Sequence, residues 1–513
     1  MKKFLLLFIL ILCVALLASC NMQEQIGQMS DKIKDQIIDM AGQFIEKNTD
    51  SSPIVDEPSD TPNEPNEPSV PDVPSEPDVP SEPDVPDVPD VPSEPDEPSV
   101  PDVPDIPDEP VIPEVPDYIL LEREKYPLNK YTGLTITKEY GVNLTNEDYK
   151  YKSVYGHGRL EIALDEALKA NPITYFSISG MESSALLDFD LSQEYVISDI
   201  ASKVHEFANK YCLSTNALSN LRRIEIGTNP DTKISAKDYA LLLNTIYDDN
   251  CMQNENKVGT TFINPEIRLI TGKMSLNLPY IQELMNEIKL LRNDEFLPIG
   301  GWSFSVSTEG KRPEDAFLGN DALKELISYR NENYNSIEIH ISDFGWDTVN
   351  TESSSFVAPS DDYTSEEIQA MYILRSFLIL QGMDVDKASY DMINDTAENG
   401  HGIIAADGTK KLSYSLLEYF KTKMNGMYLS EIVSNGENDC YCYKLENGEG
   451  KTIYAVWSSN GLKSYTIRNL PENVTLSTYD KAAKEYTDTE ITTQGLITKV
   501  INESIMFLEY TNN

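Results

Sequence analysis

The chain has 513 residues, with 85 acidic and 41 basic side chains and a formal net charge of −44. This length allows more than one domain, and the acidic excess argues against nucleic acid as a partner, because phosphate backbones need basic surfaces. We expect no cofactor and no metal site, because the four histidines are scattered along the chain and the cysteines after the N-terminal segment are too sparse for a disulfide framework. Two of those cysteines form a Cys440-Tyr441-Cys442 pattern, whose role the sequence leaves open.

The N-terminal segment predicts secretion and a membrane anchor. Lys2 and Lys3 precede an apolar run, Phe4–Leu17, that is too short to span a bilayer and typical of a signal peptide. The run ends in Leu-Ala-Ser-Cys20, which resembles the lipobox of bacterial lipoproteins. The resemblance implies residues 1–20 as a signal peptide, lipid on Cys20, and an extracytoplasmic location at the bacterial membrane or cell surface. The alternative is an ordinary signal peptide with a chance cysteine.

Two further segments precede the globular part. In residues 21–50, apolar side chains recur every three or four positions, which predicts an amphipathic stalk helix or, alternatively, a short coiled-coil seam. Residues 51–117 carry 21 acidic and no basic side chains, and from Pro62 to Pro116 every third residue is proline. Proline excludes helix and sheet, and a period of three matches polyproline II. We therefore predict a disordered, extended spacer, with a ligand for proline-binding domains as the alternative.

From residue 118 the composition becomes globular, and apolar patterns of strand and helix type alternate. Alternating strands and helices predict a parallel sheet, which over about 300 residues closes most naturally into a (β/α)8 barrel. The barrel is expected over 118–424. The expected strands are 173–179, 223–226, one within 261–271, 297–304, 338–344 and 388–393, and the expected helices are 198–211, 236–247, 278–291, 321–329 and 365–380.

The last part of the chain has short strand patterns with no helix between them. Such a pattern predicts a small antiparallel β-sandwich over 425–513. The expected strands are 439–444, 452–457, 464–468, 474–478, 496–500 and 505–510. The predicted fold class is thus α/β: a (β/α)8 TIM barrel followed by the sandwich and preceded by the proline-rich spacer.

Two short strings at the ends of expected strands carry the chemistry. Ile224–Asp231 reads I-E-I-G-T-N-P-D and resembles the strand-4 end of clan A retaining glycoside hydrolases, usually E-I-x-N-E-P-D. Ile339–Thr348 reads I-H-I-S-D-F-G-W-D-T and resembles their strand-7 end, usually T/S-E-F-G-W. The resemblance implies that Asn229 stands at the position of the catalytic acid/base and Asp343 at that of the nucleophile.

Weaker likenesses extend this resemblance over roughly residues 118–513. Gln369 and Arg375 resemble the helix that follows the nucleophile strand, Tyr390, Asp391 and Asp395 the strand-8 pattern, and Lys411–Tyr414 the K-P-S-Y closing motif. Residues 501–508 resemble the last strand of the sandwich that follows many such barrels. At strand 6, where the family usually offers N-x-H-x-Y, residues 300–305 read G-G-W-S-F-S without a histidine.

These departures predict impaired chemistry. Retaining glycosidases need two carboxyl groups about 5–5.5 Å apart, and the amide of Asn229 is neither acid nor base. The carboxylate of Asp343 is shorter than that of Glu by one C–C bond, about 1.5 Å. Four other residues are candidates to replace the missing catalytic groups, but each has a more favoured structural role. Glu225 is expected inside the barrel, and His340 is expected to be packed or hydrogen-bonded. Asp231 and Asp347 are expected in solvated or capping positions.

Four aromatic residues are candidates for stacking on a sugar, with core packing as an equal alternative: Trp302, Phe304, Trp346 and Tyr390. The favoured hypothesis is a cell-surface lipoprotein whose degenerate glycosidase-like barrel binds a carbohydrate or serves as a scaffold. One alternative is an active glycoside hydrolase that uses Asp343 with an unidentified acid. Another is a purely structural adhesin.

Overall fold

The computed structural model describes residue 123 and residues 125–136, 156–169, 182–190, 197–212, 221–247, 267–292 and 297–512. These residues all belong to one compact unit, Pro107–Asn513. The signal peptide with Cys20, the stalk helix, the proline-rich spacer and the expected strand 173–179 lie outside the described residues.

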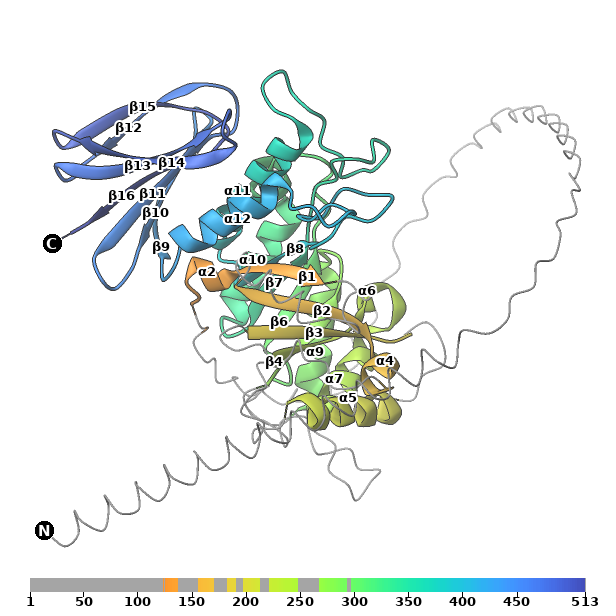
Figure 1. Ribbon diagram of the computed structural model, residues 1–513. Helices are drawn as coiled ribbons and strands as arrows, with labels where there is room; N and C mark the ends of the chain where they lie inside the picture. Colours follow the sequence, from red (N-terminus) through yellow and green to blue (C-terminus); the bar gives the residue numbers. More distant parts are fainter. Residues whose placement is uncertain are drawn as a thin grey trace, which may run out of the picture. The chain divides into compact units, whose positions relative to one another are not determined.

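Eight parallel strands form a closed barrel, and each pairs with its neighbours in chain order, with the last pairing back to the first (Figure 1). This arrangement confirms the predicted barrel. The strands are β1 (Thr132–Ile136), β2 (His157–Ala163), β3 (Glu182–Asp188), β4 (Leu221–Thr228), β5 (Arg268–Lys273), β6 (Gly301–Ser305), β7 (Glu338–Asp343) and β8 (Lys387–Asp391).

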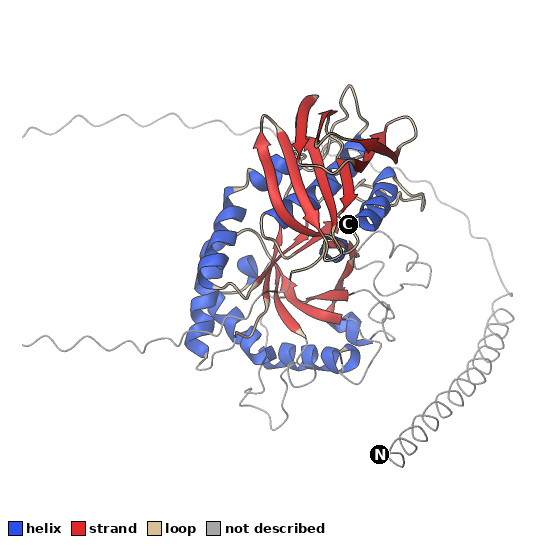
Figure 2. Ribbon diagram, turned by 90° about the vertical axis from the view of Figure 1, so that its left-hand side faces the viewer, coloured by secondary structure: helices blue, strands red, loops and turns tan. Residues whose placement is uncertain are grey.

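Helices lie outside the barrel strands, as Figure 2 shows. They are α2 (Leu128–Tyr131), α4 (Leu164–Lys169), α5 (Ile197–Tyr211), α6 (Pro230–Lys233), α7 (Ala236–Tyr247), α9 (Leu278–Leu291), the π-helix η3 (Glu314–Leu318), α10 (Asp321–Asn333), α11 (Ser365–Gly382) and α12 (Leu412–Lys423). The best-defined start is that of α11, where Thr364 and Glu367 form a capping box that satisfies two free backbone N–H groups. None of the helices in the described part of the chain has both the length and the apolar character needed to cross a membrane.

An antiparallel sandwich follows the barrel. Its larger sheet has the order β14-β13-β16-β11-β10-β9, and its smaller sheet pairs β12 with β15. The strands are β9 (Tyr428–Glu437), β10 (Cys440–Glu446), β11 (Lys451–Ser458), β12 (Lys463–Arg468), β13 (Asn473–Asp480), β14 (Glu485–Thr492), β15 (Leu496–Ile501) and β16 (Met506–Thr511). Side chains of both sheets, including Cys442, Val456, Ile467 and Ile501, form the core between them.

The barrel and the sandwich are joined by a buried polar contact. The indole of Trp457 in β11 donates to a carboxylate oxygen of Glu314 at 2.6 Å, and Arg375 on α11 donates to the other oxygen at 3.0 Å. Arg375 also donates to the backbone oxygen of Glu503, which precedes β16. Arg375 and Glu314 therefore connect the two parts.

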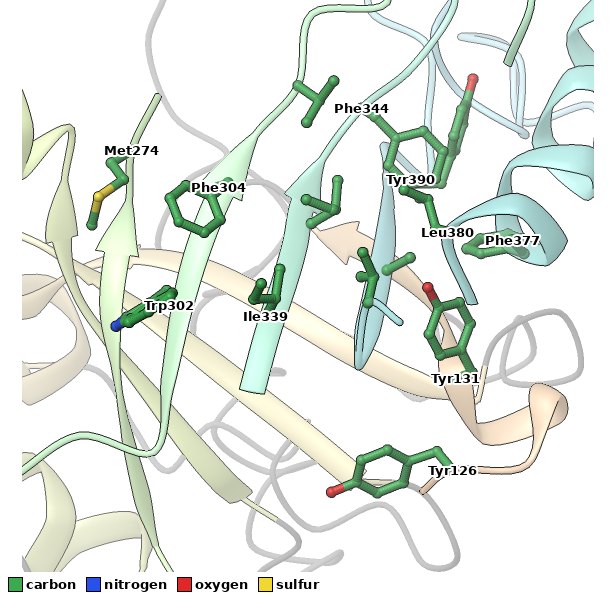
Figure 3. Close-up of a cluster of buried hydrophobic side chains, with 14 of the residues drawn as sticks. Tyr126, Tyr131, Met274, Trp302, Phe304, Ile339, Phe344, Phe377, Leu380 and Tyr390 are labelled. Atoms are coloured by element: carbon green, nitrogen blue, oxygen red, sulfur yellow. The ribbon is translucent and has the colours of Figure 1, made fainter. Parts of the chain in front are cut away.

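The alternation of side chains along the strands separates an apolar layer from a polar barrel interior. In β6 and β7, the side chains of Trp302, Phe304 and Ile339 point outward and pack in the main core beneath the helices (Figure 3), and Ile341 belongs to the same core. The intervening residues point inward, where Ser303 and Ser342 bond one another at 2.6 Å. Period-two alternation explains this division.

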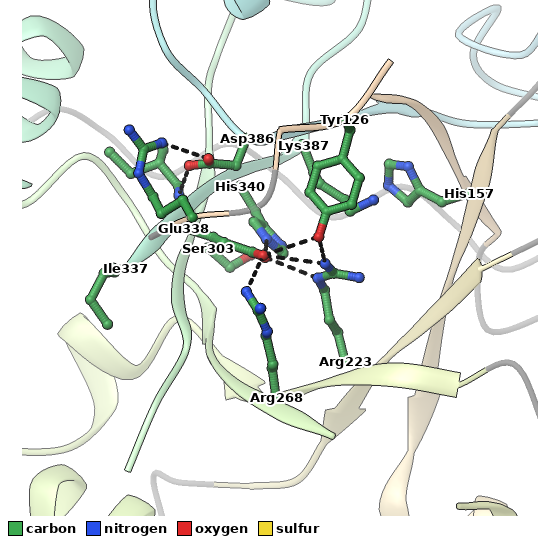
Figure 4. Close-up of polar contacts among 12 residues, drawn as sticks. Tyr126, His157, Arg223, Arg268, Ser303, Ile337, Glu338, His340, Asp386 and Lys387 are labelled. Atoms are coloured by element: carbon green, nitrogen blue, oxygen red, sulfur yellow. Dashed lines mark hydrogen bonds and ion pairs between the residues drawn. The ribbon is translucent and has the colours of Figure 1, made fainter. Parts of the chain in front are cut away.

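The barrel interior near the amino ends of the strands is filled by charged side chains, whereas bulky branched residues usually fill such barrels. Glu338 is fully buried and accepts hydrogen bonds from Arg223, Arg268, Tyr126 and the His340 ring (Figure 4). Burial opposes its charge, but Arg223 and His340 hold the pKa of Glu338 well below its usual range. Because buried charges are costly unless they are paired, this network must form as a whole.

Candidate functional site

The carboxyl ends of the barrel strands bring four polar residues to one rim. Lys273, Asp343 and Asp391 are the last residues of β5, β7 and β8, and Asn229 directly follows β4. In (β/α)8 barrels this face carries the active site, because the strands are parallel and their ends meet there. The two positions predicted from the sequence, Asn229 and Asp343, thus both lie at the rim.

A shift in strand pairing turns Asp343 toward the barrel mouth. Phe304 pairs with Ile341, but the next residue, Ser305, pairs with Asp343, so one residue of β7 is skipped. Strict alternation would place Asp343 on the outward face with Ile341. Such an irregularity re-aims a side chain, and here it allows the Asp343 carboxylate to bond across the mouth.

Lys273 joins two carboxylates at the mouth. Its ammonium lies 3.0 Å from Oδ2 of Asp343 and 2.9 Å from Oε1 of Glu161, which comes from β2. The two oxygens are therefore no more than about 6 Å apart, a separation on the scale of paired glycosidase carboxyls. Burial disfavours the ammonium, but Asp343 and Glu161 outweigh that effect and raise the pKa of Lys273.

Below this bridge lies a second, more deeply buried ion pair. Arg159 donates two hydrogen bonds to Glu225, at 2.6 and 2.8 Å, and a third to Glu161 at 2.6 Å. Ser303 adds a hydrogen bond to Glu225 at 2.9 Å. The prediction that Glu225 is an interior polar group is confirmed, since it is 1% exposed.

Negative and positive charges thus alternate from the barrel interior to the mouth, in the order Glu225, Arg159, Glu161, Lys273 and Asp343. The charge on Glu161 is opposed by burial but favoured by Arg159 and Lys273, which bring its pKa down to about 2. Glu161 is therefore ionised throughout the physiological range and cannot serve as a proton donor.

Asp391 is the protonated member of the group. Burial, together with the negative charges of Asp343 and Glu161, raises its pKa to about 8. At neutral pH the Asp391 carboxyl therefore carries a proton and can donate a hydrogen bond. An acid held near a carboxylate is the arrangement that separates acid and base roles in many active sites.

Asn229 occupies a tight turn between β4 and α6. Its backbone is left-handed, with φ 51° and ψ 52°, a conformation that Asn tolerates better than most residues. Its backbone N–H donates to the carbonyl of Lys273 at 2.7 Å, while its exposed side chain makes no capping hydrogen bond. The side chain amide is therefore available at the rim, but only as a hydrogen-bonding group.

The four aromatic candidates are not at the mouth. Trp302, Phe304, Trp346 and Tyr390 are each 0% exposed, so none offers a ring face to a ligand. Figure 3 shows Trp302, Phe304 and Tyr390 among the buried apolar side chains of the core. Of the two alternatives for these rings, the structure shows core packing and not stacking on a sugar, because they lie on the outward face of their strands or, for Trp346, in the core beside Phe317 and Tyr372.

A histidine that the sequence left unassigned lies beside the mouth. The His401 ring nitrogen Nε2 is 2.8 Å from Oγ of Ser355 and 3.8 Å from Oδ2 of Asp347. Burial lowers its pKa, against the opposing influence of Asp347 and Asp343, so the ring is neutral at neutral pH. Asp347 itself accepts hydrogen bonds from the backbone N–H groups of Val349, Asn350 and Gly400, which confirms its capping role.

Glu161, Lys273 and Arg159 were not predicted as site residues. Arg159 and Glu161 alternate with Leu160 and Ile162, a pattern typical of a strand with one polar face. Lys273 ends the strand Arg268–Lys273, as Asp343 ends its own. The sequence therefore contained these patterns, but only the closed barrel shows that β2, β5 and β7 bring these side chains together.

Lys411 and Gln369, which the sequence resemblance also includes, form hydrogen bonds that fix the loops around the mouth. Lys411 donates to Asp395 at 3.2 Å and to the carbonyl of Gly400 at 2.8 Å. Gln369 donates to the carbonyls of Trp346 and Gly400, both at 2.8 Å. His340, which bonds Glu338 in the interior, is a buried hydrogen-bonded residue, as predicted.

Comparison with known proteins supports the fold. No family model matches the chain, and no curated protein matches it in sequence. Among solved structures, the chain is similar to a family 39 glycoside hydrolase from Bacteroides cellulosilyticus, with a TM-score of 0.54, 13% identity and coverage of 76% of this chain and 82% of that one.

Two further solved structures agree. A glucosidase from Croceicoccus marinus has a TM-score of 0.55 at 11% identity, covering 76% of this chain and 98% of its own. A family 30 xylanase from Clostridium acetobutylicum has a TM-score of 0.52 at 11% identity, covering 77% and 98%. The chain therefore has the fold of clan A glycoside hydrolases, a barrel with a C-terminal sandwich.

Proposed function

We propose that this chain is a lipid-anchored extracytoplasmic protein whose barrel mouth binds a carbohydrate without the retaining hydrolysis of the enzymes it resembles in fold. The observation that carries the proposal is the 3.0 Å contact between Lys273 and Asp343. A retaining nucleophile must attack the anomeric carbon with a free carboxylate oxygen. Here the ammonium binds Oδ2 and so lowers the nucleophilicity of the whole carboxylate, although Oδ1 has no such contact in the described part of the chain. The position that carries the acid/base in the sequence resemblance holds Asn229, whose amide has no acidic proton to transfer.

The same groups are well suited to bind sugar hydroxyls. Asp343 and Glu161 accept hydrogen bonds, Lys273 and the protonated Asp391 donate them, and the Asn229 amide does both. Hydrogen bonds that involve charged groups are about twice as strong as neutral ones. A cation between two carboxylates also limits the net charge at the mouth, which favours a neutral glycan.

The direct test is a glycan array with the full secreted chain, followed by calorimetry on each hit. Lys273→Met and Asp343→Asn should each weaken binding by about tenfold, the effect of losing one charge-assisted hydrogen bond. Lys324→Met, on the outer helix α10, is the matched control and should bind as the wild type. The same hits should remain uncleaved on long incubation with the wild-type protein. Binding that both mouth variants retain would refute the proposal.

The geometry also supports a second candidate, a weak glycosidase in which Asp391 is the acid and Asp343 the base or nucleophile. The supporting observation is the pKa of Asp391, which the neighbouring charges and burial raise to about 8. Turnover by such an enzyme would fall as the pH rises above about 8 and would be lost in Asp391→Asn. If aryl glycosides are hydrolysed with that pH profile, the second candidate replaces the first.

Lipid attachment at Cys20 and the extended spacer complete the proposal. The lipobox-like Leu-Ala-Ser-Cys20 would fix the chain to the membrane, and the proline repeat of 62–116 would hold the barrel away from it. A tethered glycan-binding barrel would act at a cell surface.

A further inference from the structure

A serine and a histidine are paired on the loops that follow β7 and β8. Oγ of Ser355, in the loop between β7 and α11, lies 2.8 Å from Nε2 of His401, in the loop between β8 and α12. Solvent reaches the pair, because the His401 side chain is 20% exposed and Ser355 is only half-buried. A hydroxyl within hydrogen-bond reach of a neutral imidazole is the arrangement of an activated serine nucleophile.

The second ring nitrogen determines which tautomer His401 adopts. The ring donates a hydrogen bond to the backbone carbonyl of Asp391. A Cβ placed on Gly345 would lie 2.6 Å from that carbonyl oxygen and 3.0 Å from Nδ1 of His401, so both atoms lie against a residue without a side chain. Because Nδ1 carries the proton, Nε2 keeps its lone pair, and the Ser355 hydroxyl is the donor of the 2.8 Å bond.

Backbone hydrogen bonds hold both partners in place. The hydroxyl of Tyr390 donates to the His401 carbonyl at 2.7 Å, and the Gln369 amide donates to it at 3.4 Å. On the other loop, the N–H of Asp347 donates to the carbonyl of Ser355 at 3.0 Å. The hydroxyl and the ring are therefore aligned before any ligand binds, which removes part of the entropic cost of a reaction.

The carboxylate of Asp347 lies beside the pair with one oxygen unused. Asp347 is 1% exposed, and its Oδ1 accepts the three backbone hydrogen bonds described above, whereas Oδ2 is buried without a hydrogen-bond partner. This Oδ2 lies 3.8 Å from Nε2 of His401. When His401 takes up a proton at Nε2, the negative charge of Asp347 stabilises the imidazolium, as the acid of a catalytic triad does.

We propose that Ser355 is a nucleophile that accepts acyl groups from carboxylic esters, with His401 as its general base. Oγ of Ser355 attacks the ester carbonyl carbon while Nε2 of His401 takes the hydroxyl proton. The C–O bond to the alcohol then breaks, and the alcohol leaves with that proton. Water, which gives a proton to His401, attacks the acyl-serine, and release of the carboxylic acid returns the proton to Ser355.

The backbone around the nucleophile favours esters over amides. The N–H of Ser355 donates to Oγ of Ser353 at 3.3 Å, and the N–H of Phe356 donates to the Ser353 carbonyl at 3.0 Å, so both are used within the loop. The loss of one donor to the oxyanion costs about 10²–10³-fold in rate. Turnover should therefore be slow and should need an alkoxide leaving group. An O-acyl group on a glycan at the mouth is such an ester, and only this identification rests on the function proposed there.

The test uses the full secreted chain and a fluorophosphonate, which reacts with activated serine hydroxyls. Intact mass shows whether the label is bound, and peptide mapping locates it. We expect the label on Ser355 of the wild type and none on Ser355→Ala. His401→Gln should be labelled about 10²-fold more slowly, because general base catalysis contributes about 10²–10⁴-fold. Ser360→Ala is the matched control, since its hydroxyl lies in the same loop and accepts from the N–H of Tyr363; it should be labelled as the wild type.

Hydrolysis of p-nitrophenyl acetate gives a second readout. The wild type should release a burst of p-nitrophenol stoichiometric with the protein, because the acyl-serine accumulates, and Ser355→Ala should not. Absence of the label from the wild type, or its attachment to another serine, would overturn the proposal, and neither result depends on the folding of a variant. Equal labelling of wild type and His401→Gln would overturn it as well. Neither reagent needs a glycan at the mouth, so this proposal and the function proposed above fail separately.

Discussion

Lys273 lies 3.0 Å from Asp343, and this ion pair crosses the barrel mouth from the end of β5 to the end of β7. The contact places a cation on the carboxylate that the sequence resemblance predicts at the nucleophile position of a retaining glycosidase. It also ties Asp343 to Glu161, and through Arg159 to the buried Glu225. The chemistry of the mouth is therefore coupled to the stability of the barrel interior.

Lys273→Met should destabilise the protein by about 1–3 kcal/mol at neutral pH, because two part-buried carboxylates lose their shared cation. The loss should appear as a lower urea midpoint at an unchanged m-value. Lys324→Met is the control, since Lys324 pairs with Asp321 on the solvent-exposed face of α10, and it should change the midpoint little. If the two variants lose the same stability, the mouth ion pair is not a structural element.

Asp391→Asn should change the pH dependence of stability. The pKa of Asp391 is raised from 3.8 to about 8, so the folded state holds a proton that the unfolded state releases between these values. Stability from this group is fully present below about pH 4 and is lost as the pH rises toward about 8. The difference in urea midpoint between wild type and Asp391→Asn should therefore change steadily across this window. Parallel curves for the two proteins would show that Asp391 is ionised in the folded state.

Arg159→Met should be strongly destabilising, by about 3–5 kcal/mol, because it leaves Glu225 buried beside Glu161 with no cation. The double variant Arg159→Met with Glu225→Leu removes both members of the buried pair. It should be more stable than Arg159→Met alone, which a double-mutant cycle measures. A double variant with the sum of both single losses would contradict the inferred ion pair.

Cys20→Ser should release the protein from membranes. Acylation at this residue is the strong membrane attachment that the sequence predicts, and two or more acyl chains make such anchoring stable. Fractionation of cells that express wild type or Cys20→Ser is the measurement. Cys212→Ser, which changes a buried thiol of the barrel, serves as the control and should remain in the membrane fraction. Detergent-dependent membrane association of Cys20→Ser would exclude the lipid anchor.

Much of the fold followed from local patterns. The helices Ala236–Tyr247 and Leu278–Leu291 were predicted with the bounds they have in the structure, because each buries one face at helical spacing. The strand Glu338–Asp343 was predicted to within one residue. By contrast, β9 and β14 were missed, because most of their side chains are exposed and give no apolar alternation. The helix Leu412–Lys423 was missed as well.

The sequence by itself determined the strand–helix alternation that closes the barrel, and it predicted Asn229 and Asp343 at the ends of their strands, because both depend on spacing along the chain. Only the tertiary structure decided what surrounds them. Lys273, Glu161 and Asp391 come from three different strands, and no local pattern records which strands face one another across a closed barrel. The sequence also could not predict which way these side chains point. In the structure, strand alternation places Trp302 and Phe304 in the core, whereas one skipped residue in β7 turns Asp343 into the mouth.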